Sequence, residues 1–360
     1  MPELFDPLTL RGLTVRNRLW IAPMCQYSVF AEDGVPTDWH LVHLGQFATG
    51  GAGLVLTEAT AVTPDGRISP RDTGIWTDEQ AAAWSRIAAF LRSQGAAAGI
   101  QLGHAGRKGS TFPAWGSDDR GTVPMTAGGW QSVGPTDDPF GSLDAPAALD
   151  EAGITRVVTA FADAATRAVT AGFDVVEIHA AHGYLLHQFL SPLVNTRTDR
   201  YGGTLENRAR FLLRVVEAVR AVLGDRVLLV RFSATDWAEG GWNQADTASV
   251  ARWAADAGAD FFDISTGGAV AGVEIPLSPG YQVPFATYVR EHARVPVSAV
   301  GLITDPAEAE DIVRSGRADA VMIAREALRD PHFALRAASM SGVDDLVPGA
   351  YQRAPYPTGG

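Results

Sequence analysis

The sequence predicts an α/β protein with a single (β/α)8 TIM barrel and a long insertion after the third strand. Eight short apolar segments recur along the 360 residues, a segment of helical length follows each, and one connection is much longer than the rest. Apolar strands without alternation are typical of a parallel sheet covered on both faces. The predicted strands are 19–22, 54–59, 98–102, 175–179, 227–232, 261–265, 297–300 and 320–323.

Helices are predicted after these strands because the following segments carry apolar residues at helical spacing, and several begin with a capping residue. Thr77 precedes one of them, and Pro306 stands at the first position of another. An open, doubly wound parallel sheet is the structural alternative, since the count of eight favours closure without proving it. The predicted helices are 38–50, 78–94, 150–171, 204–223, 245–257, 281–293, 305–315 and 325–338.

The insertion covers residues 103–149 and is rich in Gly, Pro, Ser and Asp, with aromatic residues such as Trp115 and Trp130. A structureless loop of that length is uncommon in a compact domain, so we expect an ordered excursion or lid at the carboxyl ends of the strands. A surface insertion without a part in catalysis is the alternative. Residues 1–340 are expected to form the one domain, and 341–360 a C-terminal tail.

The composition excludes several classes of function. The formal net charge is −12, which argues against a nucleic-acid-binding surface or a polybasic membrane anchor. Cys25 is the only cysteine, so neither an intramolecular disulfide nor a cysteine-rich metal or iron–sulfur site can form. The N-terminus lacks a signal-peptide pattern, and no apolar run is long enough to span a bilayer. We therefore expect a cytoplasmic protein without nucleic acid or membrane as a partner.

Polar side chains are expected to meet at the carboxyl ends of the strands, where this fold holds its active sites. The fourth strand ends in HAAHGY, which contains His179, His182 and Tyr184. Two histidines at this spacing can direct N–H groups at one carbonyl or nitro oxygen, which opens a conjugated double bond to hydride attack. Tyr184 could then supply the proton as general acid. Metal binding and simple packing are the alternatives, but no carboxylate in the segment offers a third ligand, so no metal is expected.

A phosphate site is predicted at the last two strand ends. Gly301 follows the seventh strand, and Ala324-Arg325 begins the last helix, where exposed amides and an arginine suit one phosphate. One phosphate suggests a mononucleotide, and no GxGxxG motif between a strand and a helix indicates a dinucleotide site. Arg231, at the end of the fifth strand, is a cation in the barrel mouth. If a flavin lies there, Arg231 would stabilise its anionic reduced ring; pairing with a core acid is the alternative role.

Together these residues resemble the Old Yellow Enzyme family of FMN-dependent ene reductases, and within it the bacterial thermophilic-like branch. The resemblance spans nearly the whole chain and is highly specific as an ordered set. The longest shared run, 177–210, contains HAAHGYLLHQFLSP and RTDRYGGTLENRARF. The other segments that carry it are LFDP at 4–7, Asn17-Arg18, APMCQYS at 22–28, QLGHAGR at 101–107, GYQV at 280–283 and GRAD at 316–319.

The resemblance implies cofactors and roles for individual residues. FMN is the implied prosthetic group, NADPH or NADH the reductant, and a small activated alkene the substrate. His179 and His182 would bind the activating oxygen, Tyr27 would contact the substrate, and Tyr184 would donate a proton after hydride transfer from flavin N5. Cys25 would tune the flavin potential. The implied flavin contacts are Pro23, Met24, Cys25, Ala59, Gln101 and Arg231 at the ring, and Gly267, Gly301, Ala324 and Arg325 at the ribityl phosphate.

The chain departs from the family pattern at two places. Ala324 stands where the family usually has glycine, so its methyl group could crowd the phosphate. The stretch around Arg353 fits only loosely the branch motif whose arginine enters a neighbouring subunit's active site; a frayed tail is the alternative. A homodimer or homotetramer is expected. The alternative functions are a non-catalytic flavin-binding or sensor barrel and a dienoyl-CoA reductase-like flavoenzyme, which the single cysteine disfavours.

Overall fold

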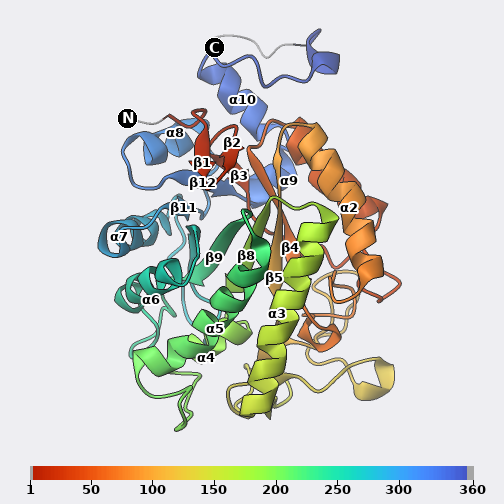
Figure 1. The fold of residues 1–360 in the computed structure, drawn as a ribbon, viewed down its shortest axis with the longest axis vertical. Helices are drawn as coiled ribbons and strands as arrows, with labels where there is room; N and C mark the ends of the chain where they lie inside the picture. The colour runs from red at the N-terminus through yellow and green to blue at the C-terminus, as the bar shows by residue number, and fades with distance from the viewer. Residues whose placement is uncertain (1–2, 355–360) are drawn as a thin grey trace.

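The computed structural model describes residues 3–354 and contains a closed barrel of eight parallel strands (Figure 1). The last barrel strand pairs with the first, which closes the ring. The predicted barrel is therefore confirmed, and the open-sheet alternative is wrong. In the order in which they pair, the strands are β3 (Leu19–Ile21), β4 (Leu54–Ala61), β5 (Ala97–Gly103), β8 (Val175–Ala180), β9 (Val227–Ser233), β10 (Phe261–Ser265), β11 (Val297–Ala299) and β12 (Ala320–Ile323).

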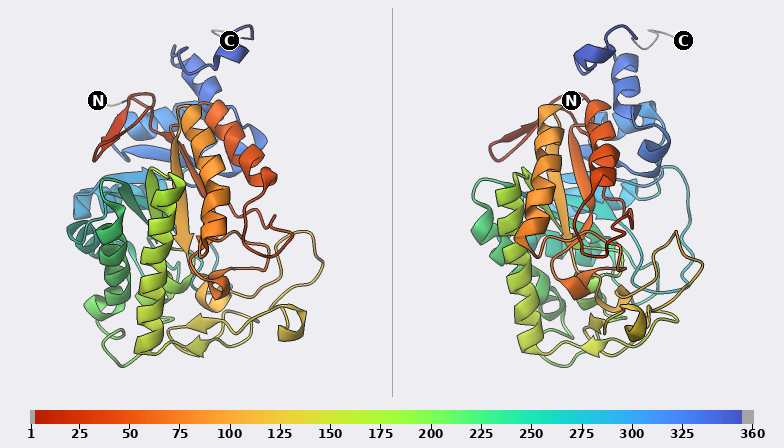
Figure 2. Two further views of the ribbon diagram at one scale, coloured as in Figure 1. Left: turned by 45° about the vertical axis from the view of Figure 1, so that its right-hand side comes forward. Right: turned by 90° about the vertical axis from the view of Figure 1, so that its right-hand side faces the viewer.

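Helices surround this barrel, as the turned views in Figure 2 show for α2 and α3. Seven of the eight predicted helices form with closely similar bounds, and a short additional helix, α4, follows the HAAHGY segment. The helices are α1 (Asp38–Thr49), α2 (Asp78–Ser93), α3 (Glu151–Ala171), α4 (Leu185–Leu190), α5 (Leu205–Leu223), α6 (Gln244–Asp256), α7 (Val283–Ala293), α8 (Pro306–Arg314), α9 (Arg325–Arg329) and α10 (Phe333–Met340).

The prediction of one continuous helix over 325–338 was wrong, because the chain forms the two helices α9 and α10 there. Pro331 lies between them. A proline has no N–H to donate and disfavours helical backbone at the residue before it, here Asp330. The Asp330 carboxylate accepts the His332 N–H at 3.1 Å, which supports the turn into α10.

A short hairpin that the sequence pattern did not predict closes the amino-terminal end of the barrel. It consists of the antiparallel strands β1 (Leu8–Leu10) and β2 (Leu13–Val15). Leu10 and Val15 are buried in the same apolar cluster as Trp20 and the first residues of several barrel strands. Because apolar residues fill this end, the polar residues that the strands carry lie toward the opposite, carboxyl end.

The insertion leaves the carboxyl end of β5 and contains only short elements, at the end of the molecule opposite the C-terminal tail (Figure 2). Backbone hydrogen bonds such as Val123 N–H to the Ser110 carbonyl order it. Residues 355–360 of the predicted tail lie outside the described part of the chain. Within 3–354, no helix is both long and apolar enough to cross a membrane. The elements of the insertion are η2 (Gly106–Lys108), η3 (Met125–Ala127), β6 (Val133–Gly134) and β7 (Ala147–Ala148).

Candidate active site

The structure brings His179, His182 and Tyr184 together at the carboxyl end of β8. His179 Nε2 lies 3.3 Å from His182 Nδ1, and the Tyr184 ring stands edge-on to His179 with ring centroids 4.9 Å apart. His179 Nδ1 accepts the backbone N–H of Ala181 at 3.2 Å. A neutral His179 therefore carries its hydrogen on Nε2, the nitrogen that faces His182.

Both histidines of this pair favour the neutral form. Burial, with added repulsion from Arg231 and Lys108, lowers the pKa of His179 and of His182 well below the usual value. In the part of the chain that the structure describes, no group of three or more His, Cys, Asp or Glu side chains is arranged to hold a metal ion. The pair is suited to offering neutral N–H donors.

An unusual backbone conformation places His182 in this pair. His182 has φ 56° and Gly183 φ 71°, both in the left-handed region that side chains with a Cβ rarely adopt. A Cβ on Gly183 would lie 2.0 Å from the Gly268 carbonyl oxygen, so only glycine permits this contact between the turns after β8 and β10. Ser233 Oγ accepts the His182 N–H at 2.9 Å and holds the turn from β9.

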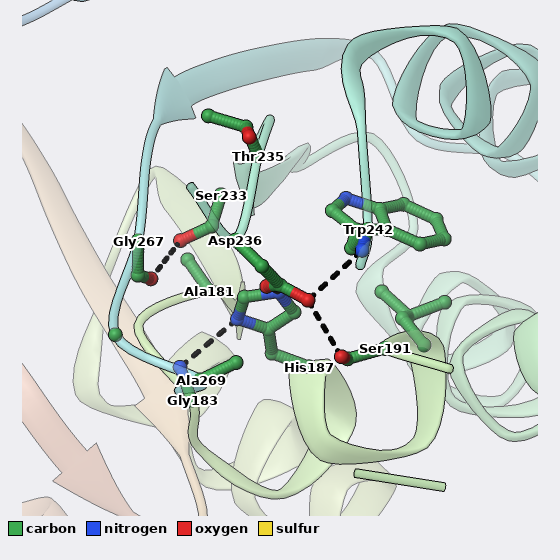
Figure 3. Close-up of polar contacts among 12 residues, drawn as sticks. Ala181, Gly183, His187, Ser191, Ser233, Thr235, Asp236, Trp242, Gly267 and Ala269 are labelled. Atoms are coloured by element: carbon green, nitrogen blue, oxygen red, sulfur yellow. Dashed lines mark hydrogen bonds and ion pairs between the residues drawn. The ribbon is translucent and has the colours of Figure 1, made fainter. Parts of the chain in front are cut away.

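A third histidine of the motif, His187, supports the same turn from behind (Figure 3). His187 Nδ1 accepts the Gly183 N–H at 2.9 Å, while its Nε2 lies 3.1 Å from Asp236 Oδ1. Asp236 Oδ2 accepts the Ser191 hydroxyl at 2.6 Å and the Trp242 N–H at 2.9 Å. Burial alone would raise the pKa of Asp236, but these hydrogen bonds and His187 lower it. His187 and Asp236 are thus a fully buried pair that braces Gly183.

Lys108, from the insertion, lies beside Tyr184 and was not identified from the sequence. Its ammonium group lies 5.2 Å from the Tyr184 ring centroid and 4.4 Å from that of Phe140. It donates to the carbonyl oxygens of His182 at 2.8 Å and Gly268 at 3.1 Å. Burial lowers the pKa of Lys108 to about 8, while burial raises the pKa of Tyr184 well above the usual value. The hydroxyl of Tyr184 therefore holds its proton at neutral pH, beside a cation.

Two side-chain pairs, one polar and one charged, link neighbouring strands of the barrel. Gln101 Nε2 donates to Glu177 Oε1 at 2.7 Å, and Arg231 Nε lies 2.7 Å from Asp263 Oδ2. Both pairs are register partners in the sheet, so the strand alignment alone could have identified them. Arg231 does pair with a core acid, the alternative that its position had left open. Burial, with repulsion from Asp263, raises the pKa of Glu177 to about 8.

Cys25 and Tyr27 follow β3 and lie among buried acids. Burial and the nearby carboxyl groups of Asp72 and Glu58 raise the pKa of the Cys25 thiol, which keeps it protonated. Tyr27 has φ 49°, and its ring meets Trp115 of the insertion edge-on, with centroids 4.8 Å apart. The insertion therefore contacts a residue predicted to face the substrate.

A small cavity of about 10 Å³ lies between several of these groups. Its lining includes Ala59, His179 and Tyr184, which were predicted site residues, and also Asp72 and His104. Burial raises the pKa of Asp72 to about 7. The cavity shows that the ends of β4, β5 and β8 meet at one place.

A second cavity, of about 60 Å³, lies at the ends of β11 and β12, and its lining includes Gly301, Ala324 and Arg325. Gly301 has φ 126°, and a Cβ there would lie 2.9 Å from Gln282 Nε2, so glycine is required. Three of the four residues expected at the phosphate thus share one cavity. Gly267 is not part of its lining; its carbonyl oxygen accepts the Ser233 hydroxyl at 2.8 Å.

The C-terminal tail places Arg353 away from this site within its own chain. Arg353 is exposed, and the segment 341–354 that follows α10 lies at the end of the molecule opposite the insertion (Figure 1). The structure of one chain therefore does not bring Arg353 to His179 and His182.

Comparisons with known proteins find relatives that match nearly the whole chain. The profile described as "NADH:flavin oxidoreductase / NADH oxidase family" matches residues 3–342. An NADPH dehydrogenase of Listeria innocua is 46% identical over 355 residues, covering 98% of this chain and 99% of the relative. Among solved structures, morphinone reductase matches with TM-score 0.79 at 30% identity, over 95% of this chain and 90% of that one. An old yellow enzyme homologue of Zymomonas mobilis matches with TM-score 0.77 at 28% identity, over 99% and 94%.

These matches confirm the expected family and establish the chain as an enzyme. The protein belongs to the NADH:flavin oxidoreductase / NADH oxidase family, which includes the Old Yellow Enzyme homologues, and its cofactor is FMN.

Proposed function

We propose that the protein uses NADPH to reduce the activated carbon–carbon double bond of α,β-unsaturated carbonyl or nitro compounds. The observation that carries this proposal is the pair of buried neutral histidines whose facing nitrogens are 3.3 Å apart beside Tyr184. The name NADPH dehydrogenase, carried by the Listeria innocua relative, supports the choice of reductant.

In this proposal the facing nitrogens of His179 and His182 donate hydrogen bonds to the carbonyl or nitro oxygen of the substrate. Their neutral state supports the assignment, because two charged rings so close together would repel each other. Hydrogen bonds to this oxygen withdraw electrons from the conjugated double bond and stabilise the negative charge that develops on the oxygen.

Tyr184 would protonate the α-carbon. Its buried hydroxyl holds a proton at neutral pH, and the ammonium group of Lys108 near its ring would stabilise the phenolate left after donation. Tyr27 would contact the substrate from the side of β3, supported there by Trp115.

The residues present fit FMN. FMN, when bound, supplies the hydride that is transferred to the β-carbon. Gly301, Ala324 and Arg325 would hold its phosphate in their shared cavity, and Gly267 would contact it from the turn after β10. Ala324, the N-cap of α9, has φ −124°, outside the left-handed region, so its backbone does not require glycine. The residues assigned to the flavin ring are Pro23, Met24, Cys25, Ala59, Gln101 and Arg231.

A homodimer or homotetramer in the cytoplasm would complete this arrangement. Arg353 is exposed and remote from the site of its own chain, which supports a role across a subunit interface rather than within one subunit. The barrel with its insertion would then be one domain, and the tail after residue 340 an interface element.

The direct test is steady-state turnover of the purified FMN-bound protein. We expect NADPH-dependent loss of 2-cyclohexen-1-one absorbance under anaerobic conditions. Bound FMN without any enone turnover would contradict the proposal and favour a sensor-type flavin-binding barrel; NADPH oxidation that depends only on oxygen would contradict the substrate class.

A further inference from the structure

A chain of hydrogen bonds with defined direction leads from β11 to His182. The Val300 carbonyl oxygen can only accept, so Gln282 donates to it through Nε2 at 3.1 Å. Gln282 Oε1 then faces the end of β10, where it lies 2.7 Å from Thr266 Oγ1 and 3.2 Å from Ser265 Oγ. Both hydroxyls donate to it. Ser265 Oγ, its hydrogen committed to Gln282, accepts from His182 Nε2 at 2.8 Å.

The ring of His179 selects the matching tautomer of His182 in the ligand-free protein, because the Nε2–H of His179 faces His182 Nδ1. With a hydrogen on Nε2, a neutral His182 has a lone pair on Nδ1. His179 carries its hydrogen on Nε2, since its Nδ1 accepts the Ala181 N–H. The two facing nitrogens, 3.3 Å apart, are therefore a donor and an acceptor that satisfy each other.

A substrate oxygen held by both rings needs a different arrangement. Both facing nitrogens must then carry hydrogen, which for a neutral His182 means Nδ1–H and an Nε2 lone pair. The Ser265 hydroxyl can turn to donate to that lone pair. Gln282 Oε1 still accepts the hydrogen bond from the Thr266 hydroxyl. Gln282 Oε1 is therefore not left without a donor when Ser265 turns toward His182.

We propose that Ser265 is a positioning residue that switches the tautomer of His182, accepting from Nε2–H in the free protein and donating to Nε2 when an oxygen ligand lies between the histidines. One proton leaves Nε2 and one joins Nδ1, exchanged with water in the barrel mouth, so the ring stays neutral. Thr266 makes the switch possible because its hydroxyl donates to Gln282 Oε1 in both states. Gln282 Oε1 therefore keeps a donor when the Ser265 hydroxyl turns to His182. This inference rests on the oxygen clamp of the proposed function.

The groups around the His182 ring favour a change of tautomer over protonation of the ring. The groups that act on His182 are Arg231, Lys108, His179 and His187, and all of them disfavour a second proton on the ring. Unlike His187, His182 has a hydroxyl and no carboxylate at Nε2. A hydroxyl can donate or accept, whereas an ionised carboxylate can only accept.

Neutron diffraction from crystals of the deuterated, oxidised FMN-bound protein tests the switch directly, with cyclohexanone as a ketone that cannot be reduced at a C=C bond. Without ketone we expect deuterium on His182 Nε2 and the Ser265 deuteron toward Gln282. With ketone we expect deuterium on Nδ1 and the Ser265 deuteron toward His182.

The outcomes separate this inference from the proposed function. A ketone oxygen bound away from the two rings overturns the oxygen clamp and the switch with it. A ketone oxygen between the rings, with deuterium on Nδ1 in both crystals, on Nε2 in both, or on both nitrogens at once, overturns the switch alone.

Variants extend the test to solution, with cyclohexanone binding followed through the flavin absorbance. Ser265→Ala removes the partner of Nε2 and should raise Kd about tenfold, the loss expected for one buried hydrogen bond. Thr266→Val, which does not touch His182, should also raise Kd because it commits the Ser265 hydrogen to Gln282. Ser265→Thr restores a hydroxyl and should restore binding.

Thr247→Ala is the matched control, since it removes a buried hydroxyl on α6 that bonds only the Asn243 carbonyl. It should bind cyclohexanone as the wild type does. Wild-type affinity in Ser265→Ala, or an unchanged Kd in Thr266→Val, contradicts the switch.

Discussion

Three histidines lie in the run HAAHGYLLH, of which His179 and His187 are buried and His182 is partly buried, and their partners differ. His187 has a backbone N–H on one nitrogen and the carboxylate of Asp236 at the other. His179 and His182 have no carboxylate partner; their facing nitrogens meet each other, and His182 reaches Ser265. A second buried pair, His40 with Glu58, follows the first arrangement, with Nδ1 accepting the Thr37 N–H and Nε2 3.1 Å from Glu58.

The difference teaches which histidines are available for chemistry. A ring bound on both nitrogens to a backbone amide and a carboxylate has one stable orientation and one tautomer, which suits the support of a turn. A ring bound to neutral, reversible partners can exchange them for a ligand. Histidine spacing in the sequence therefore does not separate support from catalysis, but the identity of each partner does.

The largest effect is expected from breaking the supporting pair. Asp236→Ala leaves His187 buried without its carboxylate, and we expect a loss of about 3–5 kcal/mol in the free energy of unfolding. Denaturant unfolding of the FMN-bound protein measures it. Asp118→Ala, an exposed acid of the insertion, is the control and should change stability by less than about 0.5 kcal/mol. Equal stability of both variants would show that His187 does not depend on Asp236.

Replacing His179 and His182, the pair proposed to bind the substrate oxygen, should instead remove ligand binding and spare FMN. In His179→Ala/His182→Ala, two hydrogen bonds to the ligand oxygen are lost, so phenol affinity should fall by about 100-fold or more. The charge-transfer absorbance of the phenol complex reports binding, and the flavin spectrum reports FMN. A retained charge-transfer band in this variant would contradict the oxygen clamp.

Tyr184→Phe should act on one half of the reaction only. We expect the oxidative half-reaction with 2-cyclohexen-1-one to slow about 100-fold, because the general acid is missing, while reduction by NADPH continues at the wild-type rate. Anaerobic stopped-flow measurement of each half-reaction gives both rates. Equal slowing of the two half-reactions would refute the role of Tyr184 as the acid.

The smallest effect is a pH dependence of stability. The pKa values of His179 and His182 are depressed in the fold, so below about pH 6.5 the unfolded chain binds protons that the folded chain does not. Stability should therefore fall as the pH drops from 6.5 to 5. The loss should be greater in the wild type than in His179→Ala/His182→Ala. Parallel pH profiles for the two proteins would show that folding does not lower the pKa values of the pair.

The barrel and much of the site follow from local sequence patterns. Apolar runs of strand length predict the strands, and the strand ends then identify His179, Gly301 and Arg325. Strand register would also have revealed Asp263 beside Arg231. Pro331 in the sequence also indicates that the helix predicted over 325–338 is interrupted.

Other features depend on contacts between distant segments and have no local signal. Lys108 reaches His182 across 74 positions, and Ser265 reaches it across 83. His187 lies in α4 and Asp236 follows β9, so only the tertiary fold brings the Asp236 carboxylate to His187. The strands of the β1–β2 hairpin have three residues each, which is too short for a clear alternation.

The most direct test of the central claim is a single turnover with prereduced, FMN-bound protein under anaerobic conditions. It compares 2-cyclohexen-1-one with 2-cyclohexen-1-ol, which has the double bond but no carbonyl oxygen. The account predicts rapid flavin reoxidation and cyclohexanone formation with the ketone, and none with the alcohol. Reoxidation by both compounds, or by neither, would contradict a site that activates the double bond through an oxygen held by His179 and His182.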